Sequence, residues 1–282
     1  MAKKQGYGDI PKGFDVYDTS KIVILPVPYD ETSTWMKGSD KGPDAIIEAS
    51  RNMYLYDIET DSEVYTNGIF TDSPVLEKVS PEFMVSAVRD RAAKHLAADK
   101  FLVTVGGEHS VSIGAVQAHA NKYKGLSVLQ LDAHADLQDE FNGSRFNHAC
   151  VMARVREVCP VVQVGIRSMD SAERAAAEPG RIFYAEEIHG RKDWMERAVS
   201  LLTDQVYVTI DVDCFDISIM PATGTPEPGG LLWYEVIDLL RMVARQKKIV
   251  GFDVVELCPN RFSKHCDFLA AKLIYRLLSF IF

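Results

Sequence analysis

Six side chains that can bind metal ions lie in three short segments of the chain: His109 in GGEHS, Asp132, His134 and Asp136 in LDAHADL, and Asp211 and Asp213 in TIDVDCFD. Burying two carboxylates and an imidazole within five residues is costly unless a cation compensates them. Four carboxylates carry four negative charges, which two divalent cations would balance. The number of ligands therefore predicts two metal ions that share bridging carboxylates.

Each segment has an alternative interpretation when it is taken alone. The glycines of GGEHS could serve close packing at a strand-to-helix turn, and a single D-x-D is a weaker signal still. In an extended chain, however, the spacing of Asp132, His134 and Asp136 places all three side chains on one face. The three segments together favour a metal site over a purely structural role.

The ligand types also bear on which metal is bound. Four hard oxygen donors and two imidazoles, with no pair of thiolates nearby, suit Mn²⁺ better than a zinc–thiolate site, and Ni²⁺, Fe²⁺ and Co²⁺ remain alternatives. Cys214 follows Asp213 directly, and in an extended segment its side chain would point to the opposite face. We expect Cys214 to belong to the core.

The three segments follow apolar runs, FLVTV, LSVLQL and VYVTI, that are typical of buried parallel strands. KIVILPVPY, VVQVGI and IVGFDVV indicate three further strands, and periodic stretches such as 81–99 and 231–246 indicate helices. Ser110 is placed to cap the helix that follows GGEHS. This alternation predicts an α/β fold whose parallel sheet carries helices on both faces. The ligands then lie at the carboxyl ends of strands, where ligand sites of such folds gather.

The composition limits the kinds of partner. With 31 basic and 40 acidic residues the formal net charge is −9, which argues against a nucleic acid or an anionic membrane and would attract a cationic substrate. Five cysteines without a C-x-x-C spacing fit reduced thiols in a cytoplasmic protein. The apolar stretch 268–282 is too short to span a bilayer, and we expect an amphipathic helix over the sheet.

The chain can bury a large core, since 47% of its 282 residues are hydrophobic. It shows no repeat, low-complexity tract or linker, so we expect a single domain over 1–282. Residues 1–20 are polar, are broken by Gly and Pro, and show no charged-then-apolar leader. We expect them to form an irregular segment on the surface.

These motifs resemble the signatures of the ureohydrolase family of arginases and agmatinases, which are GG(D/E)HS, DAHxD and a D-x-D segment leading to GTP-x-x-GG. This chain has GGEHS at 106–110, DAHAD at 132–136 and DVDCFD…TGTPEPGG over 211–230. The similarity extends to YDETSTWMKGSDKGPDAIIEAS near the start, to QVGIRS and to GFDVVELCP. The segment DEF-x-G-x-x-x-NHAC and the ending DVVELCP favour the agmatinase branch. The resemblance implies a three-layer α/β/α sandwich with an eight-stranded parallel sheet.

The resemblance also implies which ligands hold which metal. One metal would be held by His109, Asp132, Asp136 and Asp211, and the other by Asp132, His134, Asp211 and Asp213. Asp132 and Asp211 would then bridge the two metals.

Four further roles follow from the same resemblance. Glu256 in DVVELCP matches the guanidinium-binding glutamate, which can form a planar pair of hydrogen bonds. His148 in FNHAC matches the proton-shuttle histidine, and an imidazole titrates in the right range for that work. Asp136 would accept a hydrogen bond from the bridging hydroxide. Thr225 and Glu227 in TGTPEPGG would line the substrate pocket, although such a loop can also keep them for turn geometry.

The implied activity is that of a dinuclear-metal hydrolase that cleaves a guanidino compound into urea and an amine. We expect agmatine, which would give putrescine and so serve polyamine biosynthesis, as the substrate. The alternatives are N1-aminopropylagmatine, guanidinobutyrate, arginine and formiminoglutamate. Two alternatives belong to other functional classes. One is a dinuclear-metal phosphoesterase, which should carry Arg or Lys near its metals to bind phosphate. The other is a catalytically silent relative of the ureohydrolases that acts as a binding or regulatory protein. Since the family often forms trimers or hexamers, we expect a homo-oligomer.

Other residues bear on the pocket or on the surface. We expect Asp139 and Glu140 at the pocket rim, where two acids would favour an ammonium tail over a carboxylate. Ile217 and Ala222 replace a proline and a glycine of the family pattern, and an alanine where the backbone needs a positive φ would be strained. We expect four histidines to occupy ordinary surface or boundary positions: His95, His119, His189 and His265. We expect Arg167 to form a structural ion pair.

Overall fold

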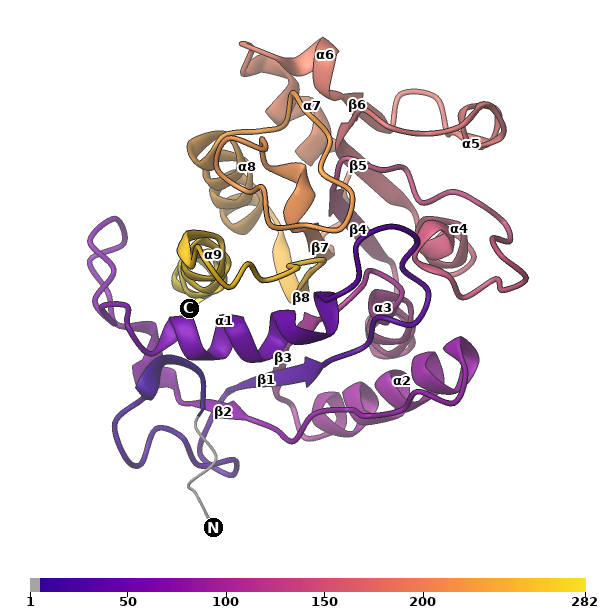
Figure 1. Ribbon diagram of the computed structural model, residues 1–282. Coiled ribbons are helices and arrows are strands. Elements are labelled where there is room, and N and C mark those ends of the chain that lie inside the picture. The colour runs from indigo at the N-terminus through magenta and orange to yellow at the C-terminus, as the bar shows by residue number, and fades with distance from the viewer. Residues whose placement is uncertain (1–5) are drawn as a thin grey trace.

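The apolar runs of the sequence form the strands of one parallel sheet with eight strands in the order β2-β1-β3-β8-β7-β4-β5-β6 (Figure 1). The computed structural model describes residues 6–282. The strands are β1 Ile22–Val27, β2 Ile69–Thr71, β3 Phe101–Gly106, β4 Leu126–Leu131, β5 Val161–Ile166, β6 Ile182–Tyr184, β7 Gln205–Asp211 and β8 Lys248–Val255. The α/β class and the eight-stranded parallel sheet are confirmed.

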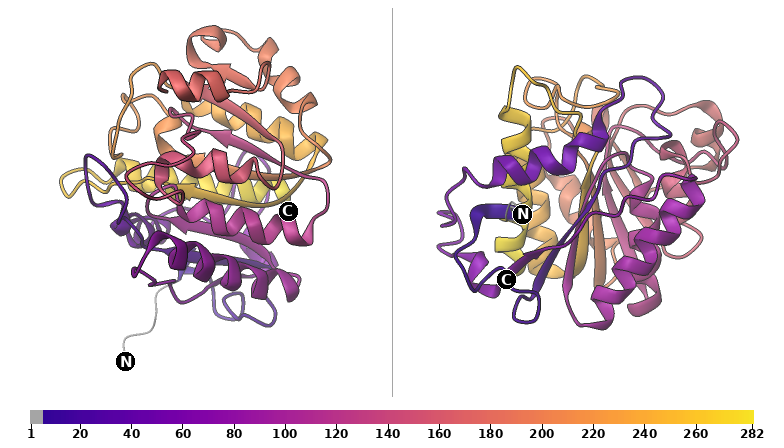
Figure 2. Two further views of the ribbon diagram at one scale, coloured as in Figure 1. Left: turned by 90° about the vertical axis from the view of Figure 1, so that its right-hand side faces the viewer. Right: turned by 60° about the horizontal axis from the view of Figure 1, so that its bottom comes forward.

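Helices cover both faces of the sheet (Figure 2). They are α1 Gly42–Ser50, α2 Pro81–Ala97, α3 Val111–Lys122, α4 Val151–Val155, α5 Ser171–Ala176, α6 Ala185–Ile188, α7 Asp193–Ser200, α8 Trp233–Gln246 and α9 His265–Ile281. Short 3-10 helices are η1 Tyr7–Asp9, η2 Ser39–Lys41, η3 Val64–Asn67, η4 His148–Cys150 and η5 Val212–Cys214.

Successive residues of a strand belong to two separate cores. In β1, Ile22 and Ile24 pack in the core shared with α1, α7, α8 and α9, whereas Val23 and Leu25 pack in the core shared with α2, α3 and α4. This follows from the alternation of side chains along a strand. Because both faces are covered, the strands read as nearly continuous apolar runs in the sequence.

The N-terminal ends of two helices show different local chemistry. Ser80 caps α2, since its Oγ accepts a hydrogen bond from Phe83 N (3.3 Å). Ser110 precedes α3 as predicted, but its backbone is helical and its hydroxyl donates to Glu108 Oε1 (2.6 Å). The prediction that Ser110 caps α3 was therefore wrong, because a nearby carboxylate takes its hydrogen bond.

Segments near both ends of the described part of the chain contain residues that are buried more deeply than the sequence suggested. In α9, Arg276 is only 4% exposed and its Nε lies 2.6 Å from Asp57 Oδ2, so this helix is covered on its polar side as well. Tyr7 is buried and donates to Ala271 O (2.7 Å) in α9. The expected irregular surface segment thus carries a buried anchor, and residues 1–5 of that segment lie outside the described part.

Two of the histidines expected at the surface are buried. His119 Nδ1 donates to Ala115 O (2.7 Å), and its ring lies 4.6 Å from the Tyr207 ring. A side chain at Gly251 would place Cβ 2.2 Å from His119 Nε2, so only glycine leaves room for the ring. His95 Nε2 lies 2.9 Å from Asp72 Oδ2. Over residues 6–282, no helix has the length and apolar character that crossing a membrane requires.

Candidate metal centre and the adjoining cavity

The candidate metal ligands converge at the carboxyl edge of four central strands. His109 follows β3, Asp132 follows β4, and Asp211 is the last residue of β7. Strand β8, which leads to Glu256, lies between β3 and β7 in the sheet. Because these strands are parallel, their carboxyl ends bring residues from distant parts of the chain to one place.

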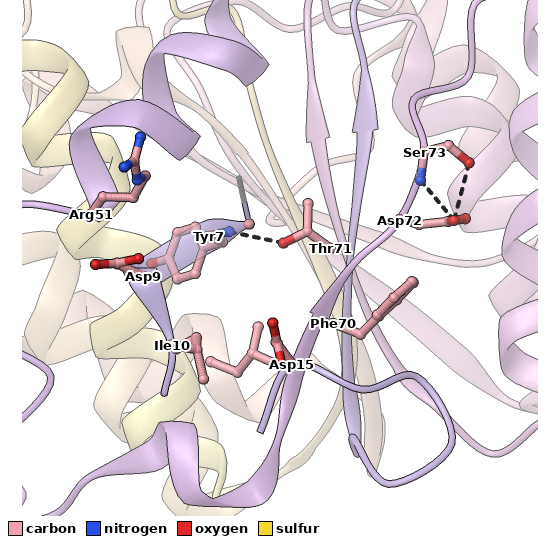
Figure 3. Close-up of a pocket in the computed structure, with 11 residues that line it drawn as sticks. Tyr7, Asp9, Ile10, Asp15, Arg51, Phe70, Thr71, Asp72 and Ser73 are labelled. Atoms are coloured by element: carbon pink, nitrogen blue, oxygen red, sulfur yellow. Dashed lines mark hydrogen bonds between the residues drawn. The ribbon is translucent and has the colours of Figure 1, made fainter. Parts of the chain in front are cut away.

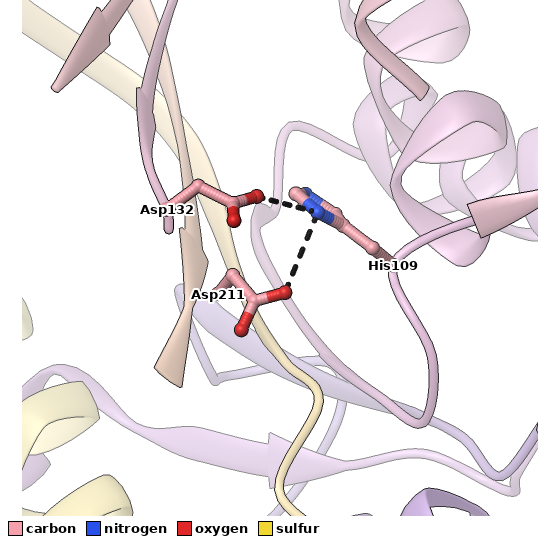
Figure 4. A group of neighbouring side chains, drawn as sticks. All are labelled: His109, Asp132 and Asp211. Carbon is pink, nitrogen blue, oxygen red and sulfur yellow. Dashed lines mark ion pairs between the residues drawn. The ribbon is translucent and has the colours of Figure 1, made fainter. Parts of the chain in front are cut away.

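Two overlapping groups of side chains could each hold a cation. One consists of His109, Asp132 and Asp211 (Figure 4), and the other of Asp132, His134 and Asp213. His109 Nδ1 lies 3.0 Å from Asp132 Oδ2 and 3.7 Å from Asp211 Oδ2, and His134 Nδ1 lies 2.9 Å from Asp213 Oδ2. Asp132 belongs to both groups, which is the position that a bridging carboxylate must have.

Asp136 reaches the same place by a sharp bend of the backbone. Strand β4 ends at Leu131, and Asp136 has a φ of 53°, so the expected extended conformation of this segment is not found. Asp136 O accepts hydrogen bonds from Met152 N (2.9 Å) and Ala153 N (3.2 Å) at the start of α4. The bend brings Asp136 Oδ2 to 2.9 Å from His109 Nδ1. A left-handed non-glycine residue held in this way is typical of a functional site.

The hydrogen bonds behind His109 leave its Nδ1 available as a ligand. Thr209 Oγ1 donates to Asp253 Oδ1 (2.6 Å) and therefore accepts a hydrogen bond from His109 Nε2 (2.8 Å). In the neutral imidazole, the form that binds a metal ion, the ring proton is then on Nε2 and Nδ1 carries the lone pair. Nδ1 is buried, has no hydrogen-bond partner and faces carboxylate oxygens. The residues present therefore fit a divalent cation.

The mutual effects of these groups on their pKa values are large. Burial and then the charges of Asp213 and Asp132 raise the pKa of Asp211 well above its ordinary range, and burial and then Asp132 raise that of Asp136 to about 7. Burial lowers the pKa of His134, but the charges of Asp213 and Asp132 and the hydrogen bonds to both carboxylates together outweigh it and raise the value to about 12. Carboxylates packed this closely must either keep protons or bind cations.

A cavity of about 350 Å³ opens beside the cluster. Its walls include four of the candidate ligands together with three of the other predicted site residues: His109, His134, Asp136, Asp211, His148, Thr225 and Glu256. None of the described residues that line it is Lys or Arg. Metal ligands and predicted substrate-binding residues thus share one cavity.

Glu227 has a different surrounding from the one predicted. It does not line the cavity, and its backbone oxygen accepts a hydrogen bond from Arg167 Nη2 (2.9 Å). Arg167 also donates to the carbonyl oxygens of Asp213 (2.6 Å) and Gly165 (3.1 Å). Arg167 is structural, but it binds backbone carbonyls rather than the carboxylate partner that was expected.

Glu256 is held at the cavity wall by the turn after β8. Its φ is 65°, its N–H donates to Gly107 O (2.7 Å), and its Oε1 accepts from His109 N (2.7 Å). Gly107 is required there, because a Cβ would lie 2.0 Å from Tyr29 O. Burial and then the charge of Glu108 raise the pKa of Glu256 well above its ordinary range. A buried carboxylate with these neighbours favours a cationic ligand.

His148 lies on the cavity wall at the start of η4. The preceding residue, Asn147, caps this turn, since its side chain accepts from Ala149 N (3.1 Å). Burial and then the charge of His134 lower the pKa of His148 to about 4. The Phe141 ring meets the imidazole edge-on at 6.2 Å between centroids.

The acidic rim expected from the sequence is made by other residues. Asp139 pairs with Arg145 (3.1 Å) and with Arg154, and neither Asp139 nor Glu140 lines the cavity. Asp170, from the turn after β5, does line it. The assignment of the rim to Asp139 and Glu140 was wrong, because the arginine of α4 draws Asp139 away.

The two departures from the family pattern do not strain their loop. Ala222 is not among the residues with a positive φ, and its carbonyl accepts a hydrogen bond from Cys258 N (2.9 Å). Ile217 is partly exposed at the surface. Cys214 is fully buried in the core, as predicted, although it lies in η5 rather than in an extended segment.

A second cavity, of about 410 Å³, lies beside the edge strand β2 and η1 (Figure 3). Tyr7 N donates to Thr71 Oγ1 (2.9 Å) across it, and Asp72 at its wall is paired with Arg91 (2.8 Å). Within residues 6–282, neither group of potential metal ligands involves these residues. The chemistry is therefore concentrated at the first cavity.

Sequence reasoning missed several polar residues that support the ligands. Gln130 Nε2 donates to Asp132 Oδ2 (2.7 Å), and Gln163 Nε2 donates to Gln130 Oε1 (2.5 Å). Thr209 supports His109 by accepting the hydrogen bond from its Nε2. Their signal in the sequence is a polar residue inside an otherwise apolar strand, as in LSVLQL, VVQVGI and VYVTI.

Comparisons with known proteins point in one direction. The sequence profile described as Arginase family matches residues 20–279. The chain is 41% identical over 263 residues to the N(1)-aminopropylagmatine ureohydrolase of Thermus thermophilus, covering 92% of this chain and 89% of that protein. It is 35% identical over 267 residues to the agmatinase of Pyrococcus horikoshii, covering 93% and 92%. The crystal structure of the agmatine ureohydrolase of Thermoplasma volcanium superposes with a TM-score of 0.89 at 27% identity, covering 100% and 95%.

Proposed function

The chain belongs to the arginase family, and from this premise we propose that it hydrolyses a cationic guanidino compound to urea and an amine. Agmatine is the substrate that we favour, with putrescine as the amine product. Water adds to the guanidinium carbon, the bond to the substituted nitrogen breaks, and that nitrogen leaves with both protons of the water as an alkylammonium ion.

One observation carries this proposal. A single cavity is lined by members of both overlapping groups of candidate metal ligands, His109 and Asp211 from one and His134 from the other, and by Glu256. Within the described part of the chain, Glu256 has no Lys or Arg partner among the ion pairs, so a planar cation could occupy that position with two parallel hydrogen bonds. The absence of Lys and Arg from the cavity wall argues against a phosphoesterase, which has to bind an anionic group.

The residues of the cavity divide the work. When bound, two divalent cations held by the six ligands supply a hydroxide nucleophile near neutral pH. Glu256 orients the guanidinium so that its carbon faces the ligand cluster. His148 delivers a proton to the departing nitrogen, and Asp136 accepts a hydrogen bond from the nucleophile. Thr225 lines the wall close to the guanidinium.

The tail of the substrate is selected farther from the cluster. Arginine and guanidinobutyrate carry a carboxylate for which the cavity wall offers no cation, while Asp170 would attract an ammonium group. An unpaired carboxylate in such a place can cost several kcal/mol, or a factor of about 10³ in kcat/KM. N1-aminopropylagmatine is the second candidate, because relatives 37–41% identical to this chain bear the name of its ureohydrolase. Its tail carries two amines and would extend past Asp170.

The experiment is a urea-release assay on the purified chain reconstituted with Mn²⁺, Ni²⁺, Co²⁺ or Fe²⁺. The substrates are agmatine, N1-aminopropylagmatine, guanidinobutyrate, arginine and formiminoglutamate. We expect Mn²⁺ to support the highest rate, and an amine-tailed substrate to have the highest kcat/KM. If no guanidino compound yields urea with any metal, the protein is a silent relative and the proposal fails.

Two further expectations belong to this proposal. We infer that residues 1–282 form one ureohydrolase domain, since all the strands belong to a single sheet. We also infer a homo-oligomer, a trimer or a hexamer, which light scattering on the metal-loaded protein would measure.

A further inference from the structure

Glu108 is fully buried next to the metal ligand His109 and accepts five hydrogen bonds. Two come from the backbone N–H groups of Thr32 (2.7 Å) and Ser33 (2.9 Å), which can only donate. The other three come from the hydroxyls of Thr32 (2.5 Å), Ser110 (2.6 Å) and Ser33 (3.2 Å). Five donors around one side chain fit an ionised carboxylate, which only accepts hydrogen bonds.

The hydroxyl of Thr32 connects this carboxylate to His148. A hydroxyl has one proton to donate and two lone pairs to accept with. The proton of Thr32 Oγ1 goes to Glu108 Oε1, so the two remaining contacts of Oγ1 must be accepted. One is from the backbone N–H of His148 (3.0 Å), and the other is with its ring atom Nδ1 (3.3 Å).

The contact with the ring fixes where the imidazole proton lies. Since Thr32 Oγ1 has no second proton, it can bind Nδ1 only if Nδ1 carries a hydrogen. In the neutral ring, Nε2 then has the lone pair. His148 lines the cavity, and within residues 6–282 its Nε2 has no hydrogen-bond partner among the contacts described. Nε2 is thus the nitrogen that is free to exchange a proton.

We propose that Thr32, anchored by Glu108, is a positioning residue that holds the His148 ring with Nδ1 protonated, so that Nε2 performs the proton transfer. This inference rests on the proposed function, in which His148 serves the departing amine. Nε2 takes up the proton released by the attacking water and gives it to the substituted nitrogen as that nitrogen leaves the guanidinium carbon. The second water proton passes from the hydroxyl of the adduct to the departing amine as the carbonyl of urea forms. Nδ1 keeps its own proton throughout, and the products are urea and an alkylammonium ion.

The variants Thr32→Val and Thr32→Ser test the inference on the metal-loaded protein. Valine keeps the shape of threonine but removes the hydroxyl, and serine restores the hydroxyl. Ser33→Ala is the matched control, because it also removes a hydroxyl donor to Glu108, and no hydrogen bond between Ser33 and His148 is among the contacts described. His148→Ala, alone and combined with Thr32→Val, shows whether Thr32 acts through the imidazole. Bound metal is measured for every variant.

We expect Thr32→Val to lower kcat for agmatine by about 10–100-fold with little change in KM, which is part of the 10²–10⁴ that acid–base catalysis contributes. Thr32→Ser should recover most of that loss, and Ser33→Ala should stay close to the unchanged protein. In the His148→Ala background, Thr32→Val should have no further effect, because the ring that it positions is gone.

The outcomes separate this inference from the function on which it rests. If the unchanged protein releases no urea, the proposed function fails. If His148→Ala is fully active, His148 has no catalytic role and the inference fails with it. If Thr32→Val lowers kcat equally with and without His148, or if Ser33→Ala lowers it as much as Thr32→Val does, the activity assignment stands but the positioning role of Thr32 is overturned.

Discussion

Removing the metal ions should make the stability of the protein fall as the pH rises, through the proton on His134. Against the effect of burial, which lowers it, the carboxylates of Asp213 and Asp132 raise the pKa of His134 from 6.5 to about 12 in the folded, metal-free chain. A histidine with a raised folded-state pKa contributes stability that is fully present below its unfolded pKa and is lost as the pH rises towards the folded value. With metal bound, His134 is a neutral ligand, so this contribution is absent.

The contribution of His134 follows from one proton. Between pH 7.5 and 8.5 the unfolded chain carries almost no proton on His134, while the folded metal-free chain carries nearly one. The proton on His134 should therefore contribute a fall of up to about 1.4 kcal/mol per pH unit in the free energy of unfolding of the metal-free protein, relative to the metal-loaded protein. His109, Asp211 and Glu256, whose pKa values are also raised well above their ordinary ranges, add to the same fall, and the comparison with His134→Asn isolates the part that comes from His134. Buried histidines outside the cluster, such as His119, contribute equally to both forms and cancel in the difference.

The assay is urea-induced unfolding of chelator-stripped and Mn²⁺-loaded protein at pH 7.5, 8.0 and 8.5. His134→Asn is the control, because it removes the titrating group and should make the stripped and loaded proteins respond to pH more alike. Parallel pH dependence of the stripped and loaded forms of the unchanged protein would refute the reasoning. In that case the metal-free cluster is not neutralised by a proton on His134.

Three further predictions concern single side chains. Asp132→Ala should lose more bound metal than Asp213→Ala, because Asp132 belongs to both ligand groups; elemental analysis checks this, and equal losses would count against a bridging role. Glu256→Gln should lower kcat/KM for agmatine by about 10²–10⁴, the effect of removing one partner of a buried charge pair, while metal content stays the same. Arg276→Met should lower the free energy of unfolding by about 3–5 kcal/mol, because it leaves Asp57 buried without its cation. A denaturation experiment measures this loss, and a value well below that range would show that Asp57 is easily solvated.

The long strands could be predicted because burial on both faces leaves a clear apolar run in the sequence. Six of the eight strands were located in this way. The two edge strands, Ile69–Thr71 and Ile182–Tyr184, have only three residues each, which is too short for such a run to stand out. Their existence followed only from the resemblance to the ureohydrolase family.

The cluster of potential metal ligands could be predicted because few structural roles require acidic residues and histidines at these spacings behind apolar strands. The structure brings them together, but the polar residues behind them could not be named in advance. Thr209 and Gln130 lie in strands as isolated polar residues, and their partners come from distant segments. A hydrogen bond between positions 32 and 108 likewise leaves no periodic trace in the sequence.

The rim shows where reasoning from local sequence fails. Asp139 and Glu140 lie close to His148 along the chain and suggested an acidic pocket mouth. Asp139 is instead paired with Arg154 from α4 and with Arg145. Charge near a site in the sequence therefore says little until its ion-pair partners are known.

The position of β8 in the sheet sets the order in which the centre can be assembled. β8 is the last strand along the chain, yet it lies between β3 and β7 and pairs with both. Until β8 is inserted, His109 and Asp211 belong to strands that have no common neighbour to hold them together. A nascent chain therefore cannot present the complete centre before β8, Lys248–Val255, has left the ribosome. Metal uptake then becomes a late event that reports the completion of folding.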